Sequence, residues 1–279
     1  MKQADSVKTY CRICESACGL LVERDERGVP LRIRPDREHP SSKGFVCAKG
    51  TRFLDVARHP DRLVRPMRRK DDGTLEAIAW EAALRLAGEK LRGIRDRYGP
   101  HSIGVYFGNP LAFNAFGVAA LPVFARALGT RNVYSAGSQD CGNKFTGAEI
   151  VHGSALIHPI PDLANAELAV FFGSNPAVSQ SSFVHLEQGS LAFDRLIERG
   201  GRVVWVDPRE TESARRWGRH LAIRPGTDVF LLLSMVHLLR AGADRSVSVE
   251  GLHQLCELAA RFPPERAETI TGVPAADIR

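Results

Sequence analysis

The chain has 279 residues, 44% of them hydrophobic, and a formal net charge of +6. This length allows one large or two ordinary domains, and the composition is that of a soluble globular protein. No transmembrane span is expected, because the longest apolar run, which begins at Val229, is broken by Ser234 and His237. Acidic residues interrupt or follow the basic runs at 62–70 and 209–224, which favours a solvated face or a phosphorylated cofactor over nucleic acid.

The N-terminal region, up to about residue 60, is expected to be β-rich. Short strand-like segments occur at 8–10, 19–23 and 31–34, and a short helix is expected over 53–56. Apolar residues are too few here for a sizeable core, so a bound metal would supply much of the order. The N-terminus has no apolar signal segment, which predicts a cytoplasmic chain whose clustered cysteines hold metal rather than form disulfides.

From Trp80 onward, short apolar strands alternate with longer helical segments. A helical period over 83–94 ends at Gly99-Pro100. The later strands are expected at 102–107, 132–134, 168–172, 202–206 and 220–223, and the helices at 113–128, 143–152, 183–198 and 227–239. This alternation predicts an α/β fold with a mainly parallel sheet, in which a small β-rich domain over 1–62 precedes an α/β domain over 63–279.

Four of the six cysteines follow the spacing C-x2-C-x3-C-x28-C: Cys11, Cys14, Cys18 and Cys47. Zinc sites usually combine two close pairs of ligands. Three close thiols on one loop with one distant thiol better suit the four corners of an iron–sulfur cubane. The spacing therefore favours a [4Fe–4S] cluster, with zinc as the alternative. Cys256 lies among leucines of an expected helix, where core packing is the simpler role.

Three loops follow the carboxyl ends of expected strands, where open α/β sheets bind ligands. Glycines there let the backbone approach a phosphate, and hydroxyls, an arginine and helix N-termini offer polar contacts. The candidate contacts are Gly173, Ser174, Asn175, Asp207, Arg209, Thr211, Gly226, Thr227 and Asp228. Ordinary turns with helix caps are the structural alternative for each loop. Three such loops in succession favour a nucleotide-containing cofactor.

The usual nucleotide-binding fingerprints do not occur. The chain has no G-x-G-x-x-G sequence, which argues against an NAD-type Rossmann domain. The segment 137–144 only superficially resembles a P-loop, because Asn143 stands where a lysine is needed and Phe145 follows Lys144.

Together these motifs resemble the N-terminal part of a molybdopterin oxidoreductase of the DMSO reductase superfamily. The family includes formate dehydrogenases, nitrate reductases and polysulfide or thiosulfate reductases, which use Mo or W bound to bis(molybdopterin guanine dinucleotide). Besides the four cysteines, the similar segments are Cys47-x-Lys49-Gly50, 62–67, 77–84, 172–176, 206–211, 224–228 and 271–274.

The resemblance implies a role for each site. Lys49 would lie between cluster and pterin on the electron path; a surface lysine is the structural alternative. The three strand-end loops would hold one guanine dinucleotide. Cys141 stands about where the family places the protein ligand to the metal, with Ser138, Asp140 or no protein ligand as alternatives. A buried free cysteine is the structural alternative for Cys141.

The implied function is two-electron redox at Mo or W, with electrons passing through the [4Fe–4S] cluster. The substrate is expected to be a small molecule such as formate, nitrate or a sulfur oxoanion, and an electron-transfer protein is the expected partner. Family catalytic subunits are longer and have a C-terminal β-barrel. Since residues 271–279 read as a helix start without a body, the sequence predicts a truncated protein.

Two other hypotheses follow from the same residues. In the first, the chain is a non-catalytic fragment that binds a cofactor or transfers electrons and needs a companion chain. In the second, it is an α/β binding module stabilised by a zinc ion.

Overall fold

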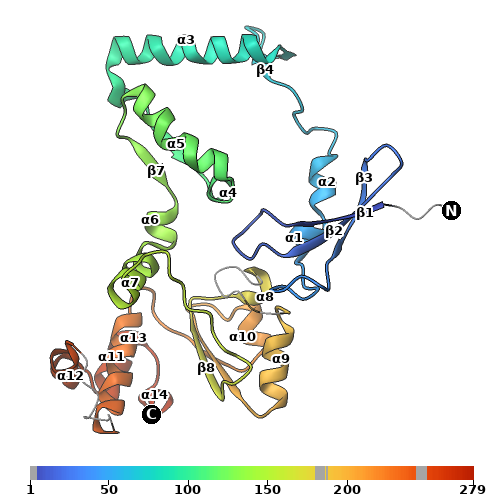
Figure 1. Cartoon of the computed structure of the whole chain (residues 1–279). Helices are drawn as coiled ribbons and strands as arrows, with labels where there is room; N and C mark the ends of the chain where they lie inside the picture. The colour runs from blue at the N-terminus through green and yellow to red at the C-terminus, as the bar shows by residue number, and fades with distance from the viewer. Residues whose placement is uncertain (1–4, 180–185, 187, 243–249) are drawn as a thin grey trace. The chain divides into compact units, whose positions relative to one another are not determined.

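The computed structural model describes residues 5–179, 186, 188–242 and 250–279 of the chain (Figure 1). The chain divides into two compact units, residues 1–160 and 161–279. The domain boundary expected near residue 62 stays a prediction.

An antiparallel three-stranded sheet opens the first unit. Its strands, in the spatial order β1-β2-β3, are β1 (Asp5–Tyr10), β2 (Gly19–Arg24) and β3 (Pro30–Pro35). The register pairs Tyr10 with Gly19, so residues 11–18, hereafter the Cys loop, close the hairpin between β1 and β2. Every residue of β1 is exposed. This sheet therefore has little core of its own, as the sequence predicted.

Short helices and two small sheets make up the rest of the first unit. The strands Met67–Arg69 and Leu75–Ala77 pair antiparallel. The strands Val105–Phe107 and Val133–Ser135 pair parallel, with Val105 opposite Val133. The elements are α1 (Ala48–Thr51), α2 (Phe53–Ala57), β4 (Met67–Arg69), β5 (Leu75–Ala77), α3 (Trp80–Tyr98), η1 (Pro100–Ser102), β6 (Val105–Phe107), α4 (Asn109–Ala112), α5 (Ala115–Leu128), β7 (Val133–Ser135), α6 (Gly137–Asp140) and α7 (Gly142–His152).

A parallel three-stranded sheet is the centre of the second unit. Its strands are β8 (Leu168–Phe172), β9 (Arg202–Val206) and β10 (Arg219–Leu221), in the spatial order β10-β9-β8. Both strand pairs are parallel, which confirms the expected α/β architecture with parallel pairing. Its helices are α8 (Pro176–Ser179), α9 (Leu191–Glu198), α10 (Glu212–Arg216), α11 (Asp228–Leu239), η2 (Arg240–Gly242), α12 (Leu252–Ala260), α13 (Pro264–Thr271) and α14 (Ala275–Ile278).

Aromatic packing forms the core of this second unit. Trp205 and Trp217 are each 1% exposed, and Phe193 is fully buried. The Phe193 ring stacks on Trp217 at 4.8 Å between centroids, and Phe171 stacks on Trp205 at the same separation. The Trp205 indole N–H donates to the backbone oxygen of Trp217, so β9 is linked to the segment that leads into β10. Buried indoles require such a partner.

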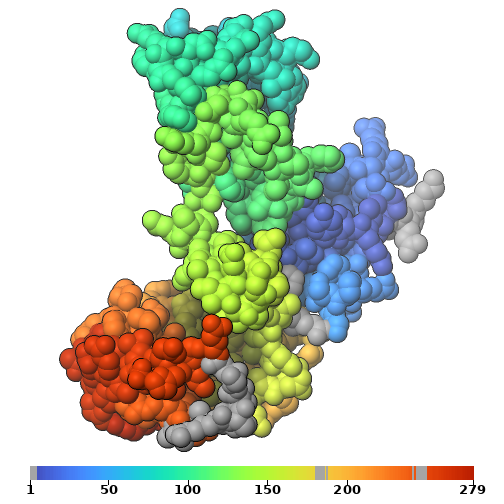
Figure 2. Space-filling model, turned by 60° about the vertical axis from the view of Figure 1, so that its left-hand side comes forward, coloured from blue at the N-terminus to red at the C-terminus, as the bar shows by residue number. Residues whose placement is uncertain are grey.

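The C-terminal helices pack together beside the sheet. Helices α12 and α13 both contact α11, and the group forms one continuous packed mass in the orange to red part of Figure 2. Phe230 on α11 and Phe262, which lies between α12 and α13, bring their ring centroids to 5.4 Å. Val273, fully buried, joins the turn before α14 to the apolar cluster around Val206.

One expected helix matches the structure closely and another starts later than expected. The helix expected over 113–128 corresponds to α5, which begins two residues later because Asn114 caps it by accepting from the Gly117 N–H at 3.1 Å. The helix expected over 183–198 begins only at Leu191. Residues 188–190 form a turn in which Gln188 has a positive φ of 56°, and 183–185 and 187 lie outside the described residues.

Within the described residues, no helix is both long and apolar enough to cross a membrane. The cytoplasmic location expected from the sequence stays a prediction.

Candidate cofactor-binding sites

The Cys loop is closed by its own backbone. The Cys11 N–H donates to the Cys18 oxygen at 2.8 Å, and the Ala17 N–H donates to the Cys14 oxygen at 3.3 Å. Ala17 has a positive φ of 43°, which non-glycine residues adopt rarely and which completes the turn. Three cysteines are thereby held on one compact hairpin end. Local sequence predicts this feature well, because short-range hydrogen bonds form it.

The fourth cysteine, Cys47, directly precedes helix α1, outside the Cys loop. Gly50, one turn later, packs against the Cys loop. A Cβ atom at Gly50 would lie 3.5 Å from the Cys11 sulfur and 2.7 Å from a Val46 methyl group. The second contact is too close for a real Cβ, so a side chain here would force Val46 to shift. The glycine of the C-x-K-G segment therefore avoids a clash with Val46 and leaves room beside the Cys11 sulfur.

Two of these thiols have raised pKa values. Burial first, and then the neighbouring Cys14, Cys11 and Cys47, raise the pKa of Cys18 to about 11. Burial is also the main cause of the raised pKa of Cys11, to which Cys14 and Cys47 contribute while the Lys49 ammonium opposes it. The four sulfurs and one cation thus share a small region of the first unit, which is the donor set that an iron–sulfur cluster requires.

All six cysteines lie in the described part of the chain and carry free thiols. As their side chains stand, no group of three or more His, Cys, Asp or Glu residues within the described ranges could hold a metal ion. The backbone gathers the four cysteines, and ligation would require their side chains to turn towards a common centre.

Cys141 lies at the junction of α6 and α7, after β7, which is the place the sequence predicted. It is 9% exposed, whereas Ser138 and Asp140 are exposed. Its pKa is raised chiefly by burial and then by Asp140, and Lys144 lowers it. A buried thiol in this position suits a soft ligand to Mo or W, because metal coordination itself removes the proton.

Two side chains of the Cys loop reach the rest of the first unit. Arg12 donates to the Phe113 oxygen, which ends helix α4, at 2.7 and 3.3 Å. Burial lowers the pKa of Lys144, whereas Glu15 and Cys141 raise it. The Cys loop and the Cys141 junction therefore lie within range of each other's charges. Sequence reasoning missed Arg12 and Glu15, because nothing in their local pattern indicates a distant partner.

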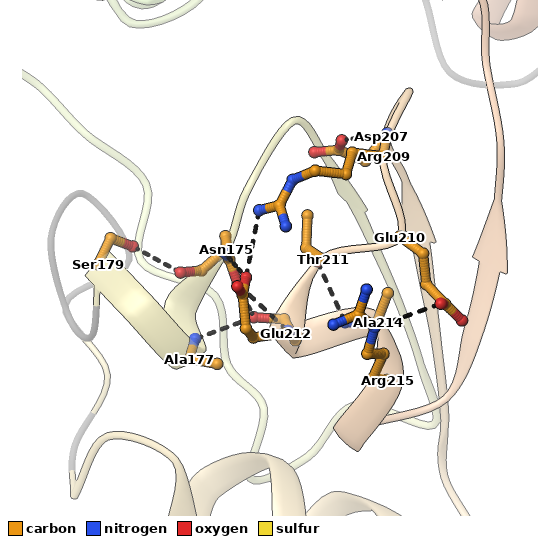
Figure 3. A network of polar contacts seen from close by, with 11 residues as sticks. Asn175, Ala177, Ser179, Asp207, Arg209, Glu210, Thr211, Glu212, Ala214 and Arg215 are labelled. Carbon is orange, nitrogen blue, oxygen red and sulfur yellow. Dashed lines mark hydrogen bonds and ion pairs between the residues drawn. The ribbon is translucent and has the colours of Figure 1, made fainter.

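The strand-end loops after β8, β9 and β10 lie at one edge of the second unit's sheet, because all three strands are parallel. Figure 3 shows that the first two loops are joined by Asn175. Its side-chain oxygen accepts from the Ser213 hydroxyl at 2.7 Å and the Ser213 N–H at 3.2 Å, and its amide donates to Glu212 at 2.8 Å. Asn175, predicted as a cofactor contact, therefore holds the two loops together.

The loop after β9 is organised by its own side chains. Asp207 accepts from the Arg209 N–H at 2.8 Å, and Thr211 caps α10 by accepting from the Ala214 N–H at 3.2 Å. The Arg209 guanidinium contacts Glu212 at 3.2 Å. Gly173 precedes these contacts with a positive φ of 57° and donates its N–H to the Val206 oxygen at 2.9 Å.

The loop after β10 leaves open space beside its glycine. Gly226 has a positive φ of 76°, and a Cβ atom there would meet nothing within 4 Å. Thr227 donates its hydroxyl to the Arg224 oxygen at 2.7 Å, and Asp228 begins α11. The Arg224 guanidinium donates to the Thr269 oxygen at 2.6 Å, near the end of α13. Arg224 is thus used structurally, whereas Gly226 leaves backbone accessible to a ligand.

We expect Asn175→Ala to lower the free energy of unfolding by about 1–3 kcal/mol, because the buried Ser213 would lose its acceptor. Urea denaturation followed by tryptophan fluorescence measures the change. Asn165→Ala is the matched control, since the exposed Asn165 donates its side-chain amide to Asp162 at 2.8 Å, within a single loop, and joins no distant segments of the described chain. Equal losses in the two variants would contradict the joining role of Asn175.

Glu212 makes stability depend on pH. Its own backbone N–H, then Asn175 and Arg209, lower its pKa from 4.5 to about 2. A depressed folded-state pKa adds stability above the unfolded value, and this stability is lost as pH falls from about 4.5 to about 2. We expect Glu212→Gln to lower the urea midpoint at about pH 7 and to have less effect at about pH 3. An equal loss at both pH values would contradict the prediction.

Comparison with known proteins gives two family matches that together span most of the chain. The molybdopterin oxidoreductase Fe4S4 domain matches residues 4–59, and the molybdopterin oxidoreductase model matches residues 62–244. The match to the Fe4S4 domain supports an iron–sulfur cluster rather than zinc as the group bound by this region. A [4Fe–4S] cluster and a Mo- or W-bound molybdopterin are therefore the cofactors of this family's domains.

Curated relatives agree with these matches. The chain is 30% identical to the F420-dependent formate dehydrogenase subunit alpha of Methanocaldococcus jannaschii, over 96% of this chain and 38% of that protein. It is 29% identical to formate dehydrogenase H of Escherichia coli, over 98% and 39% of the two chains. A nitrate reductase from Synechocystis is 28% identical over 96% and 38%. The chain thus spans about two fifths of the length of these relatives.

The fold is also similar to a solved structure. Acetylene hydratase from Pelobacter acetylenicus superposes with a TM-score of 0.76 and 26% sequence identity, over 98% of this chain and 37% of that one. The fold class expected from the sequence is thereby confirmed. Since the matching family model alone covers residues 62–244, well over half of the sequence, the chain belongs to the molybdopterin oxidoreductases.

Proposed function

We propose that this chain is the cluster-binding and nucleotide-binding part of an oxidoreductase that performs two-electron redox at Mo or W. Electrons would pass singly through the [4Fe–4S] cluster. The observation that carries the proposal is the gathering of four thiols and Lys49 in one region of the first unit, where Cys14 and Cys47 raise the pKa of Cys11 and Lys49 lowers it. When bound, the metal and its pterin supply the redox chemistry, and the protein binds, orients and tunes them.

The residues divide into three groups with different tasks. The four cysteines, Cys11, Cys14, Cys18 and Cys47, would hold the cluster. Lys49 would stabilise negative charge added between cluster and pterin, because it already lies close enough to lower the pKa of Cys11. Cys141 would ligate the metal. The strand-end loops would hold a guanine nucleotide, with open backbone at Gly226 and a charge at Arg209.

The substrate would be a small molecule of the formate, nitrate or sulfur-oxoanion class. Formate dehydrogenases and nitrate reductases are among the similar proteins, which supports the first two. An electron-transfer protein would be the partner, and the relative from M. jannaschii is itself named as a subunit alpha.

Anaerobic purification of the full chain tests the cofactor assignment. We expect iron, labile sulfide, Mo or W, and guanine nucleotide in the purified protein. Zinc without iron or sulfide would overturn the cluster. Cys141→Ser is expected to change the spectrum of the bound Mo or W, and an unchanged spectrum would refute ligation by Cys141. The iron content of this variant should equal that of the parent chain. An effect on the Mo or W site can thereby be distinguished from an effect on the cluster site.

A second candidate function is a cofactor-binding or electron-transfer part that works only with a companion chain. The observation that favours it is the length, since the chain spans 38% of the M. jannaschii relative. Two sets of assays distinguish this function from the first proposal. Formate oxidation and nitrate reduction with an artificial dye are measured on the cofactor-loaded chain alone, and again after addition of any companion polypeptide encoded beside it. Activity that requires the companion favours this second function.

A further inference from the structure

The side-chain hydroxyl of Ser16 is buried and lacks a hydrogen-bond partner in the part of the chain that the structure describes. The residue is 6% exposed, and its side-chain oxygen makes no hydrogen bond within the described residues. Buried hydroxyls are nearly always hydrogen-bonded, so an exception requires an explanation. Ser42, in the same part of the chain, shows the usual arrangement. It is 5% exposed and accepts from the Gly19 N–H at 3.1 Å, with His39 Nδ1 also at 3.1 Å.

The position of Ser16 in the chain indicates which group its hydroxyl could bind. It lies inside the Cys loop, two residues from both Cys14 and Cys18. The turn bond from Ala17 to Cys14 and the closing bond from Cys11 to Cys18 fix the backbone on either side of it. Cys18 is itself 8% exposed, so the hydroxyl is sequestered together with a cluster cysteine. Sulfur atoms of a cluster held by this loop are the acceptors that such a donor would meet.

We propose that the Ser16 hydroxyl donates a hydrogen bond to a sulfur of the [4Fe–4S] cluster, either a sulfide or a cysteine thiolate, and so tunes its reduction potential. Reduction adds negative charge to the cluster, so a donor aimed at its sulfurs favours the reduced form and raises the potential. Ser16 is then a positioning and tuning residue that donates no ligand atom. The inference rests on the proposed ligation by the four cysteines.

A redox titration of the full chain, loaded anaerobically with iron and sulfide and followed by electron paramagnetic resonance, tests this inference. Ser16→Ala is expected to weaken the reduced form roughly three- to tenfold, which lowers the midpoint potential by about 30–60 mV at about 59 mV per tenfold change. Samples in deuterated water should also lose one exchangeable-deuteron coupling to the cluster. Ser42→Ala is the control and should leave the potential and the coupling unchanged.

A pair of shape-matched variants covers the case in which the alanine variant takes up no cluster. Threonine and valine have the same shape, but only threonine carries a hydroxyl. Ser16→Thr is therefore expected to take up the cluster and to keep the reduction potential of the parent chain. Ser16→Val is expected to take up less cluster or to have a lower potential. Equal loading and equal potentials in the two variants would overturn the role of Ser16. Iron and sulfide are measured first. Their absence from the parent chain contradicts the proposed function, whereas a loaded parent with unchanged potentials in all variants contradicts only this inference.

Discussion

Replacing Cys18 by alanine is expected to abolish loading of the iron–sulfur cluster. Cys18 is the most buried cysteine of the Cys loop, and its backbone oxygen closes the loop through Cys11. Removing its thiol would remove one of the four proposed cluster ligands, and the one that is most buried within the Cys loop. We expect iron and labile sulfide per chain to fall by more than about tenfold. Mutating residues that merely hydrogen-bond metal ligands already lowers metal affinity by about 10–100-fold, and loss of a ligand should cost at least as much. Chemical analysis and visible absorption of the anaerobically loaded protein measure the loss.

Cys256→Ala is the control for this prediction. Cys256 is a half-buried thiol on α12 in the second unit, so its removal should leave the iron content unchanged. Because the N-terminal sheet has little core, the Cys18 variant should also be cleaved faster by proteases within the first 60 or so residues. Parent-like iron content in the Cys18 variant would contradict the assignment of this residue as a ligand.

The features that sequence predicted well are those set by neighbours in the chain. The strand over 168–172 and the strand over 202–206 match β8 and β9, because short apolar runs bounded by turn residues leave little alternative. The Cys loop likewise depends on contacts between residues at most seven positions apart. Gly50 was part of a recognised motif, and the structure supplies a physical reason for the glycine, since a Cβ atom there would lie 2.7 Å from a Val46 methyl group.

The features that sequence could not predict join distant residues. The expected contact of Asn175 with a cofactor stays a prediction, but sequence did not indicate that its side chain also bonds Glu212 and Ser213, which lie 37 and 38 positions further along the chain. Arg12 meets Phe113 across 101 positions. No local pattern encodes such pairs, because the parallel sheet and the docking of the Cys loop create them only after folding.

The start of a helix is harder to predict than its body. Periodicity identifies an apolar face, but it does not identify where a backbone must leave the helical region. The helix expected over 113–128 matches α5 to within two residues, with Asn114 as its cap, whereas the helix expected over 183–198 starts much later. Gln188 and Gly189 have φ values of 56° and 55°, so α9 cannot extend back through them.

Gly218→Ala is expected to be the most damaging small substitution in the second unit. Gly218 has a φ of +90°, and a Cβ atom there would lie 2.1 Å from the Val203 oxygen. That oxygen belongs to the backbone of β9, whose neighbouring Trp205 is buried, so no flexible side chain can move aside. We expect a loss of about 2–5 kcal/mol in the free energy of unfolding, from the left-handed backbone and the forced separation of β9 from β10.

Gly200→Ala separates the two causes of that loss. Gly200 has a similar φ of +85°, but a Cβ atom there would meet nothing within 4 Å. Only the conformational cost applies, so the expected loss is about 1–2 kcal/mol. Urea denaturation followed by tryptophan fluorescence reports on both variants, because Trp205 and Trp217 are buried in the same core. Since the strand-end loops are carried by β9 and β10, the Gly218 variant should also bind guanine nucleotide more weakly than the Gly200 variant. Equal losses in the two variants would mean that close contact with Val203 does not set the spacing of these strands.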